Sequence, residues 1–462
     1  MKSRLSRSRT ALVVLLMLAP LAALLSTAEE EPITLDPRLE WFVDGKLGIF
    51  IHWGLYAVNG IPESWSFFNG QISYEDYMKQ KPGFTAERYD PKAWAALFKE
   101  AGARYAVLTS KHHDGFALWP TELSDLDVMA TPAKRDLLQP YADALRAEGL
   151  KVGFYFSHLD WSHPDYASVR TKGMSTDFDG NRFAYPAPGT PDDPDSWERF
   201  LVFHRGQIKE LSDRYRPDLF WFDGDWERDE EQWDMKGLRK DLLSWQPTTI
   251  LNGRMKEYGD YETPEQGLPI FPPEGPWEFC MTINDSWGYQ VQDHNHKPVR
   301  QIIRTFAEIV GGGGNLLLDV GPYADGSLQP EQVDRLKGLG RWTKKHAEAI
   351  YGTRRGLPFG HFYGPTALAK DRQTLYLYVF DIPRDAIAVK GVRNEIDEVY
   401  VVGSGQTLAW KRSGGAPWKN IPGILLVDVP EAALDDDVTV VGIRLKGPLD
   451  LYHGSGGAIE AN

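Results

Sequence analysis

Cysteine is nearly absent from this sequence of 462 residues, which carries a single thiol at Cys280. One cysteine cannot form a disulfide within the chain, so the fold must rest on its hydrophobic core, and a chain of this length can bury a large one. The neighbours of Cys280 are mostly apolar, in the segment Trp277–Met281. We therefore expect this thiol to be buried rather than to act as a nucleophile.

Runs of basic residues are missing beyond the N-terminus, and the formal net charge is −14. Binding to nucleic acid needs a basic face that neutralises phosphates, so no nucleic-acid partner is expected. Hydrophobic residues make up 42% of the chain and charged residues 25%, which is typical of a globular protein.

Three signature motifs are also absent. The sequence has no G-x-S-x-G nucleophile elbow, no G-x-G-x-x-G after its first apolar strand, and no H-E-x-x-H. Their absence disfavours serine-based acyl transfer, a dinucleotide-binding fold and a zinc-protease helix.

Only one long apolar run occurs, and it lies at the N-terminus. The N-terminus carries four basic residues, Lys2, Arg4, Arg7 and Arg9. An apolar run over residues 11–25 and small residues at 26–28 follow, a pattern typical of a secretory signal peptide over residues 1–28. An uncleaved anchor is the alternative, although the run is short for a membrane span. We expect an exported protein, periplasmic or extracellular, with no transmembrane segment in the mature chain.

What the sequence does have is a repeated order of amphipathic helix, turn and apolar strand. This alternation predicts an α/β fold, and its length favours an irregular (β/α) TIM-like barrel over residues 29–352. The expected helices are 91–101, 137–148, 199–215 and 236–244. The expected strands are 47–54, 104–110, 151–157, 218–223, 248–254, 277–285 and 315–321.

After residue 352 the pattern changes to short β-rich segments separated by Asp, Gly and Pro. They predict a C-terminal antiparallel β-sandwich over residues 353–447, followed by a flexible tail over residues 448–462. The expected strands are 374–380, 386–389, 398–402, 408–411, 423–429 and 438–445.

Polar or aromatic residues follow five consecutive barrel strands. They are His52 and Trp53, His112 and His113, Tyr155 and His158, Trp221 and Asp223, and Asn252 and Arg254. The carboxyl ends of barrel strands meet at one face, so these side chains predict one pocket there.

Two carboxylates in such a pocket would suit a retaining glycosidase. Asp223 is the expected nucleophile, with Arg254 and the histidines as donors to its carboxylate. Its acid/base partner is either Glu265, in the loop after the fifth strand, or Glu278, at the head of the next strand. We favour Glu265 because a loop can reach the leaving group. Asp225, two residues beyond Asp223, is expected on the same side of the strand, either supporting Asp223 or as a rival nucleophile.

The paired histidines His112 and His113 allow a second interpretation, as metal ligands together with His52, His158 and Asp114. Hydrogen bonds to sugar hydroxyls explain them more simply, and we expect no catalytic metal. The aromatic residues Trp65, Phe67 and Phe68 are expected to form either an apolar wall of the pocket or part of the core.

Five motifs together resemble the α-L-fucosidases of glycoside hydrolase family 29, over about residues 41–352. They are Gly48-Ile49-Phe50-Ile51-His52-Trp53-Gly54, Lys111-His112-His113-Asp114-Gly115-Phe116, Trp221-Phe222-Asp223-Gly224, Asn252-Gly253-Arg254, and Gly314-Asn315-Leu316-Leu317-Leu318-Asp319-Val320-Gly321-Pro322. In the last motif Asp319 stands where the family commonly has Asn.

The resemblance implies a retaining hydrolase of fucosylated oligosaccharides or polysaccharides, with no metal and no cofactor. It implies that Asp223 is the nucleophile and that Glu265, after Thr263-Pro264, is the acid/base. The residues that it implies for sugar binding are His52, His112, His113, Tyr155, Trp221 and Arg254, and Trp65 joins them as a candidate from the apolar wall. Fucose is a 6-deoxy sugar, so its methyl group should meet an apolar contact, for which the candidates are Phe50, Trp53, Trp221 and Phe279. Two other functions stay open at this point: a metal-dependent hydrolase using the His112-His113 region, and a non-catalytic protein that binds fucosylated glycans.

Overall fold

The structure is a computed structural model that describes residues 35–166 and 193–454. The expected signal peptide, residues 1–28, lies outside the described residues. Within the described residues, no helix has both the length and the apolar character that crossing a bilayer requires.

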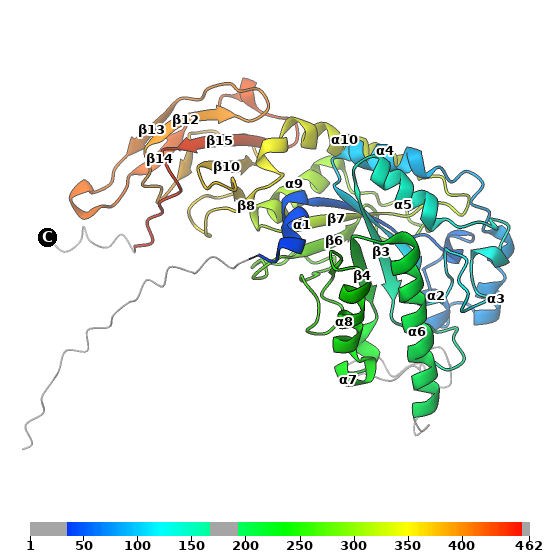
Figure 1. Ribbon diagram of the computed structural model, residues 1–462. Helices are drawn as coiled ribbons and strands as arrows, with labels where there is room; N and C mark the ends of the chain where they lie inside the picture. Colours follow the sequence, from blue (N-terminus) through cyan, green and yellow to red (C-terminus); the bar gives the residue numbers. More distant parts are fainter. Residues whose placement is uncertain (1–34, 167–192, 455–462) are drawn as a thin grey trace, which may run out of the picture. The chain divides into compact units, whose positions relative to one another are not determined.

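Seven parallel strands form one sheet in the order β5-β4-β3-β2-β1-β7-β6. Figure 1 shows that this sheet is curled. Their bounds are β1 Leu47–Ile51, β2 Tyr105–Lys111, β3 Lys151–Ser157, β4 Leu219–Asp223, β5 Ile250–Leu251, β6 Glu278–Thr282 and β7 Asn315–Val320. Every residue of these strands except Lys151 is buried, which is the environment of a parallel sheet with helices on its outside. Cys280 is buried within β6, as expected.

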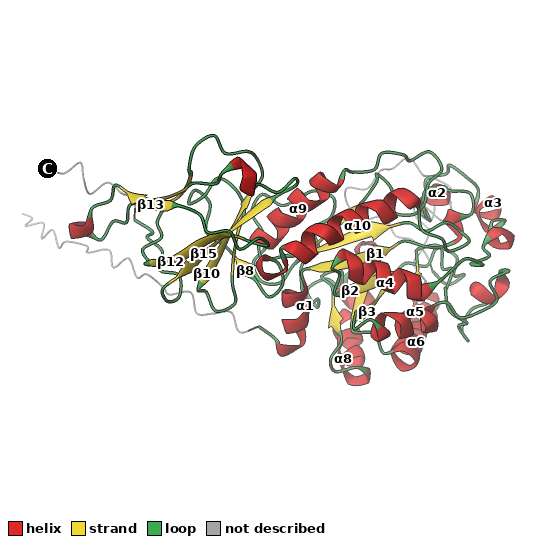
Figure 2. Ribbon diagram, turned by 90° about the horizontal axis from the view of Figure 1, so that it is seen from above, coloured by secondary structure: helices red, strands yellow, loops and turns green. Residues whose placement is uncertain are grey.

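Helices connect these strands and cover the sheet (Figures 1 and 2). Their bounds are α1 Glu40–Gly45, α2 Trp65–Phe68, α3 Tyr74–Met78, α4 Pro91–Ala101, α5 Leu138–Ala147, α6 Pro194–Tyr215, α7 Glu230–Trp233, α8 Met235–Trp245, α9 Val299–Gly311 and α10 Pro330–Lys345. The chemistry of α4 shows why the sequence pattern was informative. Asp90 caps its first turn, Pro91 occupies the first position, and Gly102 ends the helix with a φ of 98°.

The ring between β5 and β6 is closed by an irregular segment, residues 261–265, rather than by an eighth regular strand. Parallel bridges join Asn252 to Tyr261 on one side, and Glu262 to Trp277 and Glu265 to Cys280 on the other. The backbone N–H groups of Glu278 and Cys280 donate to the carbonyls of Glu262 and Pro264, at 2.9 and 3.2 Å. This segment therefore runs parallel to β6, toward the carboxyl ends of the strands.

β5 is much shorter than the expected strand 248–254 because a side chain takes over its pairing. The amide of Asn252 accepts from the backbone N–H of Phe222 at 2.8 Å and donates to the Phe222 carbonyl at 2.9 Å. The neighbouring strand β4 keeps its hydrogen bonds while the chain leaves the sheet toward Arg254.

The C-terminal part contains two antiparallel sheets, in the orders β12-β15-β10-β9-β8 and β11-β14-β13. The bounds are β8 Arg354–Arg355, β9 Thr366–Leu368, β10 Thr374–Val379, β11 Ile387–Val389, β12 Ile396–Val401, β13 Trp410–Ser413, β14 Ile424–Val427 and β15 Thr439–Leu445. Buried residues of both sheets, among them Leu377, Val389, Leu425 and Ile443, share one core. The predicted fold class is confirmed, although the sequence analysis missed β8 and β9. The domain boundaries at 352 and 447 stay a prediction.

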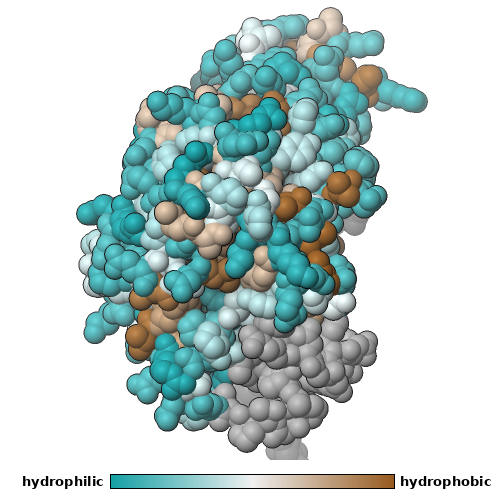
Figure 3. All heavy atoms as spheres, turned by 90° about the vertical axis from the view of Figure 1, so that its right-hand side faces the viewer, coloured by the Kyte–Doolittle hydropathy of each residue, from teal (hydrophilic) through white to brown (hydrophobic). Residues whose placement is uncertain are grey.

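A contact between the two parts links α10 to β15. The indole Nε1 of Trp342 in α10 donates at 2.9 Å to the carbonyl of Val438, the residue directly before β15, and Trp342 is buried. The surface in Figure 3 is mainly hydrophilic, with apolar side chains in small groups among polar ones. Exposed apolar side chains scattered in this way are common on protein surfaces.

Candidate active site

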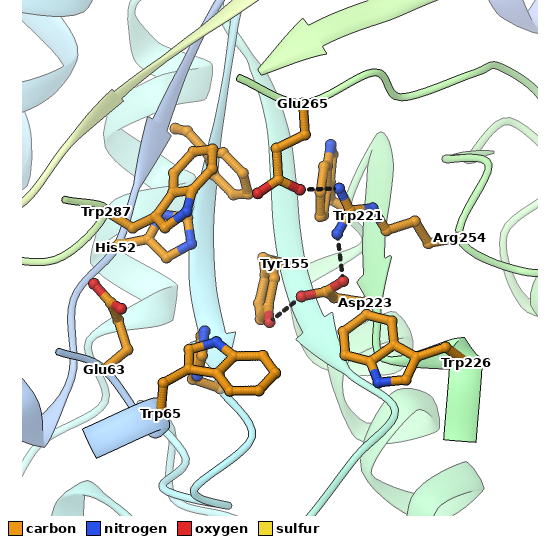
Figure 4. A pocket seen from close by; sticks show the side chains of 12 residues that line it. His52, Glu63, Trp65, Tyr155, Trp221, Asp223, Trp226, Arg254, Glu265 and Trp287 are labelled. Atoms are coloured by element: carbon orange, nitrogen blue, oxygen red, sulfur yellow. Dashed lines mark hydrogen bonds and ion pairs between the residues drawn. The ribbon is translucent and has the colours of Figure 1, made fainter. Parts of the chain in front are cut away.

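A cavity of about 400 Å³ opens at the carboxyl ends of the parallel strands (Figure 4). Its lining combines carboxylates, one guanidinium, two imidazoles and several aromatic rings. The lining residues are Phe50, His52, Glu63, Trp65, His112, Tyr155, Trp221, Asp223, Trp226, Arg254, Glu265 and Trp287. Six of the seven predicted sugar-binding residues are among them, and so are Asp223 and Glu265.

Asp223 is the last residue of β4 and its side chain is 11% exposed. Oδ1 accepts from Arg254 Nη1 at 2.6 Å, and Oδ2 accepts from the Tyr155 hydroxyl at 2.9 Å. Charge-assisted hydrogen bonds of this kind orient a carboxylate and stabilise its negative charge. Asp223 is thus held with both oxygens at the cavity.

Asp225 does not share this position, and the expectation drawn from strand geometry was wrong. Gly224 has a φ of 87°, so the chain turns sharply after β4. A Cβ at Gly224 would lie 2.4 Å from Leu159 Cγ, which makes glycine necessary there. Asp225 begins a short 3₁₀ helix and its Oδ2 accepts from the Lys256 backbone N–H at 3.0 Å, away from the cavity lining.

The two candidate acid/base glutamates lie in different places. Glu265 lines the cavity, and its side chain is 37% exposed. Glu278 is fully buried at the start of β6, where Oε1 accepts from Trp221 Nε1 at 2.8 Å and Oε2 from the Tyr105 hydroxyl. Because it begins the strand, Glu278 lies at the opposite end of β6 from the cavity. Burial raises its pKa to about 7, against the hydrogen bonds from Tyr105 and Trp221.

Arg254 contacts two of the three cavity carboxylates, Asp223 and Glu265 (Figure 4). Nη1 donates to Asp223 and Nη2 to Glu265. Its guanidinium carbon also lies 4.6 Å from the centre of the Trp221 ring, within the range of a cation–π contact. Burial opposes the charged form, but the two carboxylates outweigh it and raise the pKa of Arg254. The two acids therefore lie within the span of one guanidinium.

The histidines are neutral because burial lowers the pKa of His52, His112 and His113 well below the usual range. The Nδ1 atom of each ring makes a hydrogen bond to another side chain. The partners are Asp319 for His52 at 2.7 Å, Ser64 for His112 at 2.5 Å and Ser157 for His113 at 2.6 Å. His52 and His112 line the cavity. His113 is not among the lining residues, but its Nε2 lies beside the cavity, 3.6 Å from Oδ2 of the lining residue Asp223.

Of the aromatic residues Trp65, Phe67 and Phe68, one forms part of the cavity wall and two belong to the core. Trp65 lines the cavity, whereas Phe67 and Phe68 are 1% and 2% exposed within the core. The rings of Trp65 and Trp226 are nearly parallel, with centroids 6.5 Å apart. Flat apolar surfaces of this kind suit the faces of a sugar ring.

Of the candidates for an apolar contact, only Phe50 and Trp221 line the cavity. Trp53 is buried and its Nε1 donates to the Tyr323 carbonyl at 2.9 Å, while Phe279 is buried on β6. Both of these residues alternate away from the interior positions that reach the cavity.

With this geometry in hand, comparison with known proteins assigns the chain. The family model described as Alpha-L-fucosidase matches residues 20–348. The chain belongs to the α-L-fucosidase family. This confirms the resemblance expected from the five sequence motifs, and with it the enzyme class, a glycoside hydrolase.

Relatives within this family support the assignment. The tissue alpha-L-fucosidase of Bos taurus is 31% identical over 352 residues, which cover 69% of this chain and 70% of that protein. Alpha-L-fucosidase isoenzyme 1 from Paenibacillus thiaminolyticus superposes with a TM-score of 0.78 at 35% identity, covering 89% of this chain and 99% of that one. A family 29 fucosidase from Bacteroides thetaiotaomicron, described as a trapped covalent intermediate with 2-fluoro-fucosyl fluoride in a Glu-to-Gln mutant, has a TM-score of 0.78 at 27% identity and covers 89% and 97%.

Three cavity residues of this family member were given no role from the sequence: Glu63, Trp226 and Trp287. Glu63 is buried and its Oε1 accepts from the Gly288 backbone N–H at 2.6 Å, so it ties the loop after β1 to the loop after β6. Trp287 follows β6 by five residues. Extending the search for polar and aromatic residues to the end of the sixth strand would have found it.

The structure gives no arrangement that favours a metal interpretation of the paired histidines. Within residues 35–166 and 193–454, no three His, Cys, Asp or Glu side chains are grouped to hold an ion. The Nδ1 atoms of His112 and His113 are engaged by serine hydroxyls. The arrangement is one that can bind hydroxyl groups beside two carboxylates.

Proposed function

We propose that this chain is a retaining α-L-fucosidase that removes terminal α-L-fucosyl residues from oligosaccharides or polysaccharides. The observation that carries the proposal is the pair Asp223 and Glu265, two carboxylates on one guanidinium in a cavity walled by aromatic rings. Retaining glycosidases use two carboxylates separated by about 5–5.5 Å.

In the first step, Asp223 attacks the anomeric carbon and the bond to the leaving oxygen breaks. Glu265 gives its proton to that oxygen, so the glycan departs as an alcohol and a fucosyl ester of Asp223 remains. In the second step, the Glu265 carboxylate takes a proton from water as the water oxygen attacks the same carbon, and Asp223 leaves as a carboxylate. The covalent intermediate described for the Bacteroides thetaiotaomicron relative supports this route.

Arg254 holds both carboxylates in place for the two steps. Its guanidinium donates to Asp223, which attacks in the first step, and to Glu265, which activates water in the second. In the first step Glu265 must contact the leaving oxygen rather than the guanidinium. We propose that the leaving group, entering between Glu265 and Arg254, weakens this ion pair before proton transfer.

Sugar recognition is proposed to rest on the neutral histidines and the aromatic wall. His52 and His112 offer imidazole nitrogens to hydroxyl groups, and Tyr155 and Trp221 line the floor. The 6-methyl group of fucose needs an apolar contact, which Phe50 and Trp221 offer because their rings lie 4.9 Å apart at the cavity. Export through the N-terminal segment is part of the proposal and rests on the sequence pattern of residues 1–28.

The test compares Asp223→Ala with Asp225→Ala on an aryl α-L-fucoside. Asp225 is a matched control, because it is a neighbouring carboxylate that lies away from the cavity. We expect the first variant to lose turnover and the second to keep it, and the first product of the wild type to be α-L-fucose by NMR. Near-wild-type turnover by Asp223→Ala, or a β-configured first product, would contradict the proposal.

Azide then identifies the roles of the two carboxylates. With Asp223→Ala, azide should enter by a single displacement and give β-L-fucosyl azide. With Glu265→Ala, it should attack the covalent intermediate and give α-L-fucosyl azide. A non-catalytic glycan-binding protein would show binding of fucosylated glycans without turnover of any of them. A metal-dependent hydrolase would lose its activity in chelator and regain it with Zn²⁺.

A further inference from the structure

The side chains that are hydrogen-bonded to Nδ1 of the adjacent residues His112 and His113 decide which nitrogen of each ring carries the proton. A neutral imidazole has one N–H donor and one bare acceptor nitrogen, so fixing the role of Nδ1 fixes the role of Nε2. Within the described residues, neither Nε2 makes a hydrogen bond to protein. The hydrogen bonds of Ser64 and Ser157 therefore determine what each ring offers.

Ser64 donates its proton to His112. Its hydroxyl is fully buried and already accepts from the Asp114 backbone N–H at 2.9 Å. Among the described residues the one acceptor for its own proton is His112 Nδ1, at 2.5 Å. Leaving a buried hydroxyl proton unpaired costs on the order of 1–3 kcal/mol. The proton therefore points to Nδ1, and His112 must carry its own proton on Nε2.

Ser157 has the opposite role toward His113. Its fully buried hydroxyl lies 2.7 Å from the Leu159 carbonyl and 2.6 Å from His113 Nδ1. A carbonyl can only accept, so the serine proton points to Leu159. The second contact is then a hydrogen bond only if Nδ1–H donates to the serine oxygen. His113 Nε2 is therefore bare.

We propose that Ser64 and Ser157 act as positioning residues that give two adjacent histidines opposite polarity, so that His112 presents an Nε2–H donor and His113 a bare Nε2 acceptor to the sugar hydroxyls. The bare Nε2 of His113 and Oδ2 of Asp223 are 3.6 Å apart and both accept. Two acceptors this close select a hydroxyl that donates, next to the attacking carboxylate. The buried, neutral state of both rings agrees with this assignment.

The inference deepens the proposed function, but its main test needs no turnover. The full chain is labelled with ¹⁵N-histidine, and the imidazole nitrogens are read by long-range ¹H–¹⁵N correlation near neutral pH. The chain has 11 histidines, so His112→Asn and His113→Asn assign the two rings by the signals that disappear. We expect Nδ1 bare and Nε2 protonated in His112, and the reverse in His113. The same tautomer in both rings, or an imidazolium in either, would overturn the proposal even if fucosidase activity is present.

Serine variants then test the cause. In Ser157→Ala we expect the His113 proton to move to Nε2, where Asp223 Oδ2 can accept it. In Ser64→Ala we expect His112 to lose its preference for the Nε2–H form. Each variant should lower kcat/KM on an aryl fucoside about tenfold, mainly through KM, as one misdirected hydrogen bond would.

Matched controls separate polarity from packing. Ser66→Ala and Ser110→Ala each remove a buried hydroxyl that donates to a backbone carbonyl and touches neither histidine. They should leave both tautomers unchanged. If the Ser64 and Ser157 variants also leave the tautomers unchanged, these serines do not set the polarity. If the tautomers are as expected but no fucoside is hydrolysed, the proposed function fails and this assignment stands.

Discussion

Glu265 and Glu278 belong to neighbouring segments of the barrel, yet they lie in opposite environments. Glu265 is at the cavity rim, partly exposed and paired with Arg254, while Glu278 is fully buried beneath Trp221. The bridge that pairs Glu265 with Cys280 shows that the two stretches run side by side. Both residues are glutamates, so it is the position at the carboxyl or the amino end of the strands that decides which carboxylate can reach a substrate.

The two glutamates also differ in the charge of the groups that surround them. At the rim, Asp223 and Glu265 are both paired with the guanidinium of Arg254. At the opposite end of β6, Glu278 accepts from the neutral donors Tyr105 and Trp221, and burial raises its pKa. Glu265 at the cavity rim is therefore placed to act on a substrate, whereas the buried Glu278 holds Trp221 in place.

The largest expected effect separates the two glutamates. Glu265→Gln should lower kcat on a fucosyl oligosaccharide by about 10²–10⁴-fold, the contribution of a general acid/base. Glu278→Gln should stay within about tenfold, because its amide can still accept from Trp221. Steady-state kinetics of both variants beside wild type decides this, and a greater loss in Glu278→Gln would reverse the assignment.

Replacing the shared guanidinium should come next. Arg254→Lys should lower kcat/KM by roughly 10²-fold, because an ammonium cannot contact Asp223 and Glu265 through two fixed nitrogens. The matched control is Arg239→Lys, which removes a partly buried guanidinium bonded to Asp260 away from the cavity. Equal losses in both variants would mean that Arg254 acts only on stability.

The pH dependence of stability should distinguish the buried Glu278 from Glu265 at the rim. The pKa of Glu278 is raised to about 7 from an unfolded value of 4.5, so the folded chain holds this proton where the unfolded chain has lost it. Its contribution to the free energy of unfolding therefore falls as pH rises through this window, by roughly 3 kcal/mol in total. Glu278→Gln lacks this loss.

Denaturant unfolding measures the effect. The stability of Glu278→Gln relative to wild type should increase from about pH 4.5 to about pH 7 and then stay constant. A relative stability that does not change with pH would show that burial does not raise the pKa of Glu278.

The smallest effect is expected at the aromatic wall. Trp226→Ala should raise KM by about three- to tenfold with little change in kcat, since it removes an apolar surface beside the cavity. Trp418→Ala, at a tryptophan 77% exposed in the C-terminal part, should change neither constant. A kcat loss in Trp226→Ala that matches its KM change would place this ring in the chemical step instead.

Much of the barrel was predictable because helix caps and glycine stops are local signals. The residues around 91–101 and 105–111 show this, since Asp90, Pro91 and Gly102 mark the helix and an apolar run marks the strand. β8 and β9 were missed because strands of two and three residues carry too little alternation.

Local reasoning failed where one residue changed the path of the chain. The left-handed conformation of Gly224 moved Asp225 off the strand, and the side chain of Asn252 shortened β5. Trp287 and Glu63 reach the cavity from loops whose paths depend on contacts with distant segments. No spacing rule in the sequence contains those contacts.

By itself the sequence determined the alternation of helix and strand, the family and the place of Asp223 at the end of an apolar strand, because each depends on short-range patterns. Only the tertiary structure decided that Glu265 rather than Glu278 faces the cavity. The choice depends on how residues 261–265 close the ring between β5 and β6, and that closure is a long-range arrangement of backbone hydrogen bonds. The roles of His112 and His113 depend in the same way on Ser64 and Ser157, which folding brings to them from other elements.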